Sequence, residues 1–86
     1  MTINQLTYQL CKIFLAVFKL SNASQAATEL GISNSAISRA LASLREMYDD
    51  PLFVRTQSGF CPTQKAVEIS QTMVETVQLF RKMDKQ

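Results

Sequence analysis

Residues 23–48 restrict the fold of this chain more than any other segment does. The segment reads ASQAATELGISNSAISRALASLREMY, with Gly31 between two stretches of helical periodicity. In the second stretch the apolar residues step by four, three and four positions, which places them on one face of an α-helix. They are Ile37, Leu41, Leu44 and Tyr48. The pattern predicts two helices joined by a short turn.

Polar residues mark where these two helices begin and end. Asn22 and Gln25 stand three apart, as in an asparagine form of the capping box, and predict a helix start at Asn22. Gly31 can take the left-handed conformation that ends a helix. The hydroxyl of Ser33 can then cap the next helix, whose positive dipole end suits a phosphate.

The polar face of the second helix is suited to the DNA major groove. Small residues let the backbone approach the bases, and Asn, Ser and Arg can bond to base edges or phosphates. DNA contact is one interpretation of these side chains, and an ordinary surface role is the other. In the second interpretation the serines are ordinary surface residues, and Arg39 is a solvent-exposed arginine that pairs with an acidic neighbour. The candidate DNA contacts here are Ser33, Asn34, Ser35, Ala36, Ser38, Arg39 and Arg45.

A further helix is predicted over residues 4–20. Leu6, Leu10, Phe14 and Phe18 repeat every four residues, and neighbouring apolar residues widen the arc beyond one face. This width favours core packing, with a partner surface on part of the arc as the alternative.

A small β-hairpin is predicted after the helix pair. The helix ends near residues 49–51 because Pro51 cannot continue it. Residues 52–55 and 60–62 form the strands, and the turn spans residues 56–59. A surface loop is the alternative. We expect Arg55 to contact a phosphate or the minor groove, or else to pair with Asp49 or Asp50.

The last predicted helix begins after its cap, Thr63, and runs to the end of the chain. Its apolar stripe extends to a second side, which is more than one small domain can easily cover. We therefore expect a dimer seam, with intramolecular core as the alternative. The residues assigned to dimerisation are Ala66, Val67, Ile69, Ser70, Met73, Val74, Val77 and Phe80.

Composition excludes several classes of function. With 86 residues the chain is one domain at most, and 47% hydrophobic residues is too many for a disordered chain. The net charge of +2 is small, so binding to a polyanion must depend on where the charges lie. The chain has no His, and Cys11 and Cys61 lack metal-ligand spacing or a base partner. We expect no metal, no cofactor and no enzymatic activity.

Location follows from the same features. No apolar run is long enough for a membrane span, and the N-terminus lacks the features of a signal peptide. The expected location is the cytoplasm. Cys11 and Cys61 are expected to pack as small apolar residues in a reducing compartment.

Four blocks of sequence resemble the DNA-binding domain of LysR-type transcriptional regulators. The resemblance covers nearly the whole chain, and the four blocks stand in the family's order and at its spacing. The blocks are Ala26-Ala27-Thr28-Glu29-Leu30-Gly31-Ile32-Ser33, then Ser35-Ala36-Ile37-Ser38-Arg39 followed by Leu44, then Asp50-Pro51-Leu52-Phe53-Val54-Arg55, and finally Pro62-Thr63.

The resemblance implies a mainly α winged helix-turn-helix, with a three-helix core and wing over residues 1–62. Residues 63–86 would form a linker helix that joins two copies on a dyad-symmetric promoter site. A tetramer is possible in a longer protein, and an effector ligand would need a C-terminal domain that is absent here.

The chain departs from the family at four places. Arg45 stands where the family often has Glu, and Ser58 replaces a basic residue at the wing tip. Asn34 is one methylene shorter than the common Gln, and Lys65-Ala66 replaces a common Ala-Gly pair. Ser58 remains a candidate DNA contact through its place in the wing.

With this resemblance, the sequence predicts a sequence-specific binder of double-stranded DNA from a bacterial transcription regulator. The resemblance also implies a location in the bacterial cytoplasm, on the nucleoid when DNA is bound. The alternative from another class is a helical protein-interaction module that pairs with a regulator and binds no DNA itself.

Overall fold

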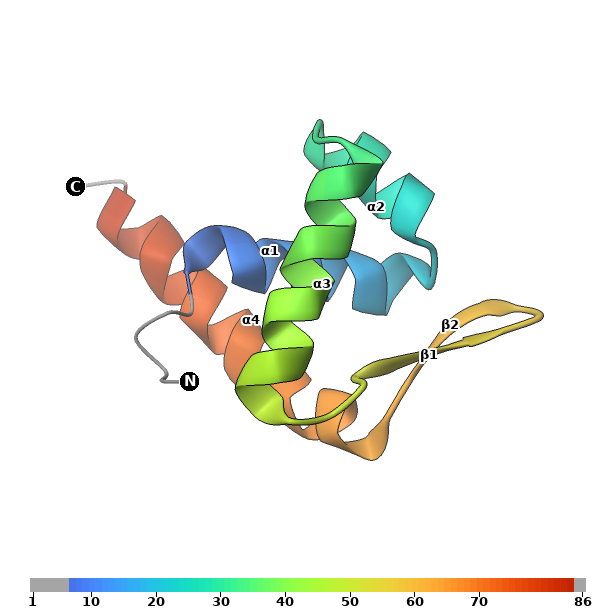
Figure 1. The fold of residues 1–86 in the computed structure, drawn as a ribbon. Helices are drawn as coiled ribbons and strands as arrows, with labels where there is room; N and C mark the ends of the chain where they lie inside the picture. The colour runs from blue at the N-terminus through green and yellow to red at the C-terminus, as the bar shows by residue number, and fades with distance from the viewer. Residues whose placement is uncertain (1–6, 85–86) are drawn as a thin grey trace.

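The chain folds into a helical bundle with a projecting β-hairpin (Figure 1). The structure is a computed structural model that describes residues 7–84. Its elements are α1 (Tyr8–Leu20), α2 (Ala23–Leu30), α3 (Asn34–Tyr48), β1 (Phe53–Thr56), β2 (Gly59–Pro62) and α4 (Gln64–Asp84). This is the winged helix-turn-helix that the sequence predicts, with the hairpin as the wing.

Three predicted helix starts and one predicted helix end are confirmed by hydrogen bonds and dihedral angles. The side chains of Asn22, Ser33 and Thr63 accept a first-turn backbone N–H, at 2.9, 3.0 and 3.1 Å respectively. Gly31 ends α2 with a φ of 70°, in the left-handed region. The bend between α2 and α3 therefore has the caps that its sequence indicates.

Helix α1 begins later than predicted. It starts at Tyr8, because Thr7 is extended and its hydroxyl accepts the N–H of Leu10 at 3.1 Å. A Thr in this position satisfies an end-of-helix donor that would otherwise lack a partner. The earlier part of the prediction, residues 4–6, lies outside the described residues.

The hydrophobic core lies where α1 packs against the other three helices and the base of the wing. Phe14, Ile37, Leu44 and Leu52 are among its largest fully buried side chains. The ring of Phe53 joins the wing to α1, with its centre 5.2 Å from that of Phe14. The core interpretation of α1 is thus confirmed.

The hairpin is tighter than predicted. Thr56 pairs with Gly59, so the turn itself is only Gln57 and Ser58. The first strand begins at Phe53, because Leu52 has a φ of 63°, which no strand residue adopts. The prediction of Leu52 as a strand residue is wrong, although its side chain is fully buried.

The two cysteines lie in different environments. Cys11 is buried in the core, and burial raises the pKa of its thiol. Cys61 is exposed, so the prediction that it packs as an apolar residue is wrong. It faces outward on β2 opposite Val54, which is also exposed. Across residues 7–84, no helix has the length and apolar character needed to cross a membrane.

Candidate nucleic-acid interface

Helix α3 divides into a buried face and an exposed polar face. Ile37, Ala40, Leu41 and Leu44 are buried in the core. The opposite side of the first two turns is exposed, and within residues 7–84 its side chains make no hydrogen bond or ion pair. These exposed residues are Asn34, Ser35, Ser38 and Arg39. Their donors and acceptors therefore remain available to a ligand.

Ser33 and Ala36 have structural parts to play at the start of this face. The hydroxyl of Ser33 accepts the N–H of Ala36, which caps α3. Ala36 is half-buried, and its small side chain leaves the start of the helix accessible to an approaching surface. An exposed, capped helix start carries a partial positive charge that suits a phosphate.

Arg45 has an internal role that the sequence did not predict. It is half-buried, and its Nε donates to the carbonyl oxygen of Pro51 at 2.9 Å. This bond ties the end of α3 to the loop that leads into the wing. Arg45 also lines a cavity of about 320 Å³ between α3 and the wing, together with Ser38 and Arg55.

Arg55 lies on β1, exposed, with its guanidinium over the ring of Phe60. The carbon of the guanidinium is 4.9 Å from the ring centre, within the range of a cation–π interaction. Within the described part of the chain, no ion pair joins it to Asp49 or Asp50. The salt-bridge alternative is therefore wrong, and the charge of Arg55 faces the same side as the cavity beside α3.

The wing tip is polar and internally bonded. The hydroxyl of Thr56 donates to the carbonyl oxygen of Gly59 at 2.9 Å and accepts the N–H of Ser58 at 3.2 Å. Ser58 itself is exposed and its side chain is free of hydrogen bonds within the described residues. The tip therefore presents a hydroxyl and an amide, Gln57, but no charge.

The second strand of the wing is bonded, close to the wing tip, to the turn between α1 and α2. The N–H of Phe60 donates to the carbonyl oxygen of Ser21 at 2.8 Å. Gly59 has a φ of 115°, and a Cβ there would collide with the same oxygen. This attachment determines where Arg55 stands relative to α3.

The sequence reasoning missed this support for Arg55. The signal was present, because the predicted strands, joined by a turn over residues 56–59, already place Arg55 opposite Phe60, which is the pairing that the structure has. The contact between Gly59 and Ser21 spans too much of the chain for any local pattern to indicate it.

The predicted dimer stripe on α4 is only partly exposed. Ala66, Met73 and Val77 are buried in the chain's own core, with at most 5% exposure. Their assignment to a dimer seam is therefore wrong, because no partner could reach them in this fold. Ile69 and Ser70 are half-buried, whereas Val67, Val74 and Phe80 are exposed.

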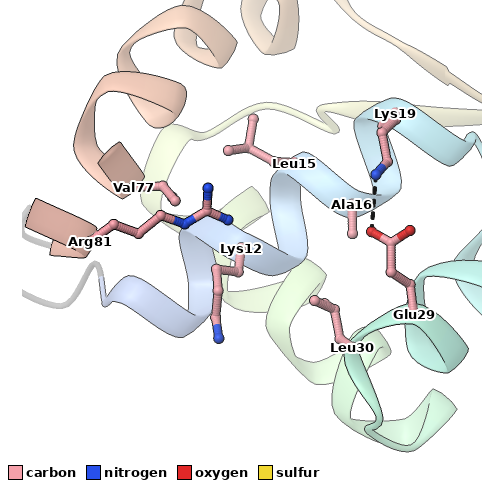
Figure 2. Close-up of a pocket in the computed structure, with 8 residues that line it drawn as sticks. All are labelled: Lys12, Leu15, Ala16, Lys19, Glu29, Leu30, Val77 and Arg81. Atoms are coloured by element: carbon pink, nitrogen blue, oxygen red, sulfur yellow. Dashed lines mark hydrogen bonds and ion pairs between the residues drawn. The ribbon is translucent and has the colours of Figure 1, made fainter. Parts of the chain in front are cut away.

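A second cavity lies away from the polar face of α3, between α1, α2 and α4 (Figure 2). Its volume is about 190 Å³, and Leu15, Ala16 and Val77 contribute apolar surface. At its edge Lys19 forms an ion pair of 3.1 Å with Glu29. No residue of α3 or the wing lines it, so it is separate from the candidate interface. Among residues 7–84 no group of acidic, His or Cys side chains could hold a metal.

Comparison with known proteins identifies relatives of this chain. The family model described as "Bacterial regulatory helix-turn-helix protein, lysR family" matches residues 8–67. The chain is 36% identical over 72 residues to the HTH-type transcriptional regulator PhcA of Ralstonia nicotianae, covering 84% of this chain and 21% of that protein. It is 39% identical over 56 residues to the HTH-type transcriptional regulator YidZ of Salmonella newport, covering 65% of this chain and 18% of that protein. The chain thus spans about a fifth of the length of these curated relatives.

Solved structures of other proteins have the same fold as this chain. A probable transcriptional regulator, PA0477 from Pseudomonas aeruginosa, superposes with a TM-score of 0.85 and 34% identity, over 93% of this chain and 27% of that chain. BenM_DBD in a complex with catB site 1 DNA superposes with a TM-score of 0.85, over 93% of this chain and 90% of that chain. Its identity of 20% supports the fold alone. By the match to the family model over most of its length, this chain belongs to the lysR family of bacterial regulatory helix-turn-helix proteins.

Proposed function

We propose that this chain is the DNA-binding unit of a bacterial transcription regulator and reads a specific sequence in double-stranded DNA. The observation that carries the proposal is the exposed face of α3, whose Asn34, Ser35, Ser38 and Arg39 have no partners in the described part of the chain. Buried polar groups need partners, but exposed unpaired groups at a capped helix start are available to base edges. The family of this chain supports the same function.

In this proposal α3 enters the major groove. Asn34, Ser35, Ser38 and Arg39 face the bases, Ala36 allows close approach, and Ser33 lies near a phosphate. Arg55 contacts the flanking backbone or minor groove from the wing. Ser58 can add a neutral hydrogen bond at the tip. Arg45 acts from the cavity between α3 and the wing, where one of its nitrogens already holds the loop.

We also propose a homodimer that is formed through the exposed side of α4. Val67 and Val74 are 52% and 41% exposed and stand two turns apart on that helix. When a second copy covers apolar side chains in such a line, their removal from water stabilises the dimer. Two copies would place their α3 helices about 34 Å apart, or a multiple of it, on a dyad-symmetric site. The site of action is the bacterial cytoplasm, and a tetramer or an effector ligand would require further domains.

The exposed apolar residues of α4 also favour a second candidate function, a protein-interaction module that binds no DNA. Leu79 and Met83 are 59% and 61% exposed, on a different side of α4 from Val67 and Val74. Such a module would pair with a regulator through α4 and leave the polar face of α3 unused. The two candidates predict opposite responses to duplex DNA.

Selection of binding sites from random duplexes tests the proposal. We expect a two-fold symmetric consensus, and an affinity for it that falls steeply with salt. Roughly six to eight phosphate contacts per dimer give a slope of about −5 to −7 in log K against log salt. Equal affinity for selected and scrambled duplexes would contradict sequence reading. An absence of binding at low salt would instead favour the protein-interaction module.

A further inference from the structure

One carboxylate oxygen lies where α3, the wing and α4 meet. Asp50 follows the end of α3 by two residues and is half-buried. Its Oδ1 accepts the N–H of Leu52 at 2.8 Å and the hydroxyl of Thr63 at 2.8 Å. Leu52 immediately precedes the first strand of the wing, and Thr63 is the residue before α4. Figure 1 shows these three chain segments together at the base of the wing.

Thr63 has a second role at the same junction. Its hydroxyl oxygen accepts the N–H of Ala66 at 3.1 Å, which caps α4, while its own proton goes to Asp50. Its backbone N–H donates to the carbonyl oxygen of Leu52 at 2.8 Å. The start of α4 is therefore bonded to the entry of the wing through both a side chain and the backbone.

The segment between α3 and the wing adopts a conformation that needs this support. Leu52 has a φ of 63°, and the N–H of Phe53 donates back to the carbonyl oxygen of Pro51 at 2.6 Å. A bulky residue at positive φ is strained and persists only where its surroundings hold it. Asp50 holds the N–H of Leu52, and Arg45 holds the carbonyl oxygen of Pro51.

We propose that Asp50 and Thr63 are positioning residues, which act with the packing of α4 on α1 to set the angle at which α4 leaves the DNA-reading unit. The hydrogen bond between them is a side-chain link from the end of α3 to the start of α4. In a dimer joined by α4, this angle fixes the distance between the two α3 helices. The pair therefore restricts which spacing of half-sites the dimer accepts, without touching DNA. This inference rests on the proposed function.

Substitutions at Thr63 separate this role from helix capping. Thr63→Ser keeps both the cap and the hydroxyl donor. Thr63→Asp keeps a strong N-cap but has no proton to give Asp50, and it sets two carboxylates against each other. A helix that is merely well capped would tolerate both substitutions, so a difference between them reports the contact with Asp50 and not the cap.

Substitutions at Asp50 separate the acceptor from the charge. Asp50→Asn retains an Oδ1 that can accept both hydrogen bonds, whereas Asp50→Ala removes it. Asp49→Asn is the matched control, because it removes the same charge one residue earlier, at an exposed helix end whose φ of 51° Asn tolerates. We expect Asp50→Asn and Asp49→Asn to behave like the unchanged chain.

Binding is measured to one half-site and to paired half-sites whose spacer varies by single base pairs. For Thr63→Asp and Asp50→Ala we expect half-site affinity within about threefold of normal, and affinity at the preferred spacing reduced about tenfold or more, because the linkage no longer favours one geometry. The affinity of these two variants should vary less with the spacer length, whereas Thr63→Ser should keep the normal variation. An unchanged spacing profile for Thr63→Asp would overturn the proposal. Absence of DNA binding by the unchanged chain would instead overturn the proposed function.

A second measurement does not depend on DNA. Spin labels on the wing tip and on α4, at Gln57→Cys and Gln78→Cys with Cys61→Ser, report the angle between the two elements. Both positions are exposed, and buried Cys11 is protected from the label. We expect one narrow distance distribution for Thr63→Ser and a broad one for Thr63→Asp, with circular dichroism confirming that both are folded. Equally narrow distributions, or unfolding of Thr63→Asp despite its cap, would contradict a positioning role.

Discussion

The guanidinium of Arg55 lies over the ring of Phe60, its direct partner across the hairpin, with 4.9 Å between the guanidinium carbon and the ring centre. The same Phe60 bonds through its N–H to Ser21, so the cation stands on a residue that is itself fixed to the helical bundle. A side chain held in this way loses less conformational freedom when it binds a phosphate. The side chain of Arg55 is thus already held in place for the contact with the DNA backbone or minor groove that we propose for it.

Replacing Phe60 should weaken DNA binding through Arg55. Phe60→Leu removes the ring and should reduce affinity by about 0.5–1 kcal/mol, the usual size of an exposed cation–π interaction, while Phe60→Tyr keeps it. A double-mutant cycle with Arg55→Ala measures the coupling. If the two effects add without coupling, the ring does not position the guanidinium.

Arg39→Ala should reduce affinity for the preferred duplex by about 1–3 kcal/mol if the guanidinium bonds bidentately to a base. The residue is exposed on α3 and has no partner in the described part of the chain. Arg81→Ala, on α4, removes the same charge far from the proposed reading face and serves as the control. Equal losses for the two variants at fixed salt would show that only net charge matters.

The two glycines should differ sharply in their response to alanine. A Cβ on Gly31 meets nothing, so Gly31→Ala costs only the left-handed conformation, about 1–2 kcal/mol. A Cβ on Gly59 would collide with the carbonyl oxygen of Ser21, which is backbone and cannot move aside cheaply. We expect Gly59→Ala to detach the wing and to lower DNA affinity more than Gly31→Ala does, in binding assays paired with thermal unfolding. Similar affinities for both variants would argue against the attachment.

Substitutions at two valines on α4 should distinguish the face of the helix that packs in the core from the face that we propose as the dimer seam. Val77 is 5% exposed, so Val77→Glu places a carboxylate on the buried face of α4 and should strongly destabilise the chain. Val74 is 41% exposed, so Val74→Glu should leave a folded protein that sediments as a monomer. A Val74→Glu variant that stays dimeric would place the seam elsewhere on the surface.

Alkaline pH should destabilise the fold partly through Cys11. Burial raises the pKa of its thiol above the ordinary 9.0, so the folded chain keeps a proton that the unfolded chain loses. The contribution is therefore complete below about pH 9 and is lost as pH rises through the higher folded pKa. Denaturant unfolding at several pH values should show a shallower alkaline loss for Cys11→Ala. Cys61→Ser is the control, a cysteine replaced at an exposed position.

Local interactions were readable from the sequence. The caps at Asn22, Ser33 and Thr63 each satisfy an amide only three residues away, so residue type and spacing suffice to predict them. The buried stripe of α3 was predictable for the same reason, because its period repeats within one element. The exposed face of α3 followed directly as the opposite side of the helix.

Interactions between distant segments could not be predicted from the sequence in this way. Asp50 and Thr63 stand 13 residues apart, and their link depends on how the wing folds between them. The burial of Ala66, Met73 and Val77 depends on which side of α4 faces α1, and helical periodicity gives two adjacent apolar lines without ranking them. Exposure of Cys61 follows from strand alternation, once the register with Val54 is known.

The attachment of the wing to the carbonyl oxygen of Ser21 limits how far this hairpin can be treated as a separate module. A two-stranded hairpin alone is marginal in water, and this one has only four residues in each strand. Its Phe53 and Phe60 rings pack on each other and on α1, and its amide reaches the end of that helix. Grafted onto another scaffold, the wing would lose its shape unless the turn after α1 were transplanted with it.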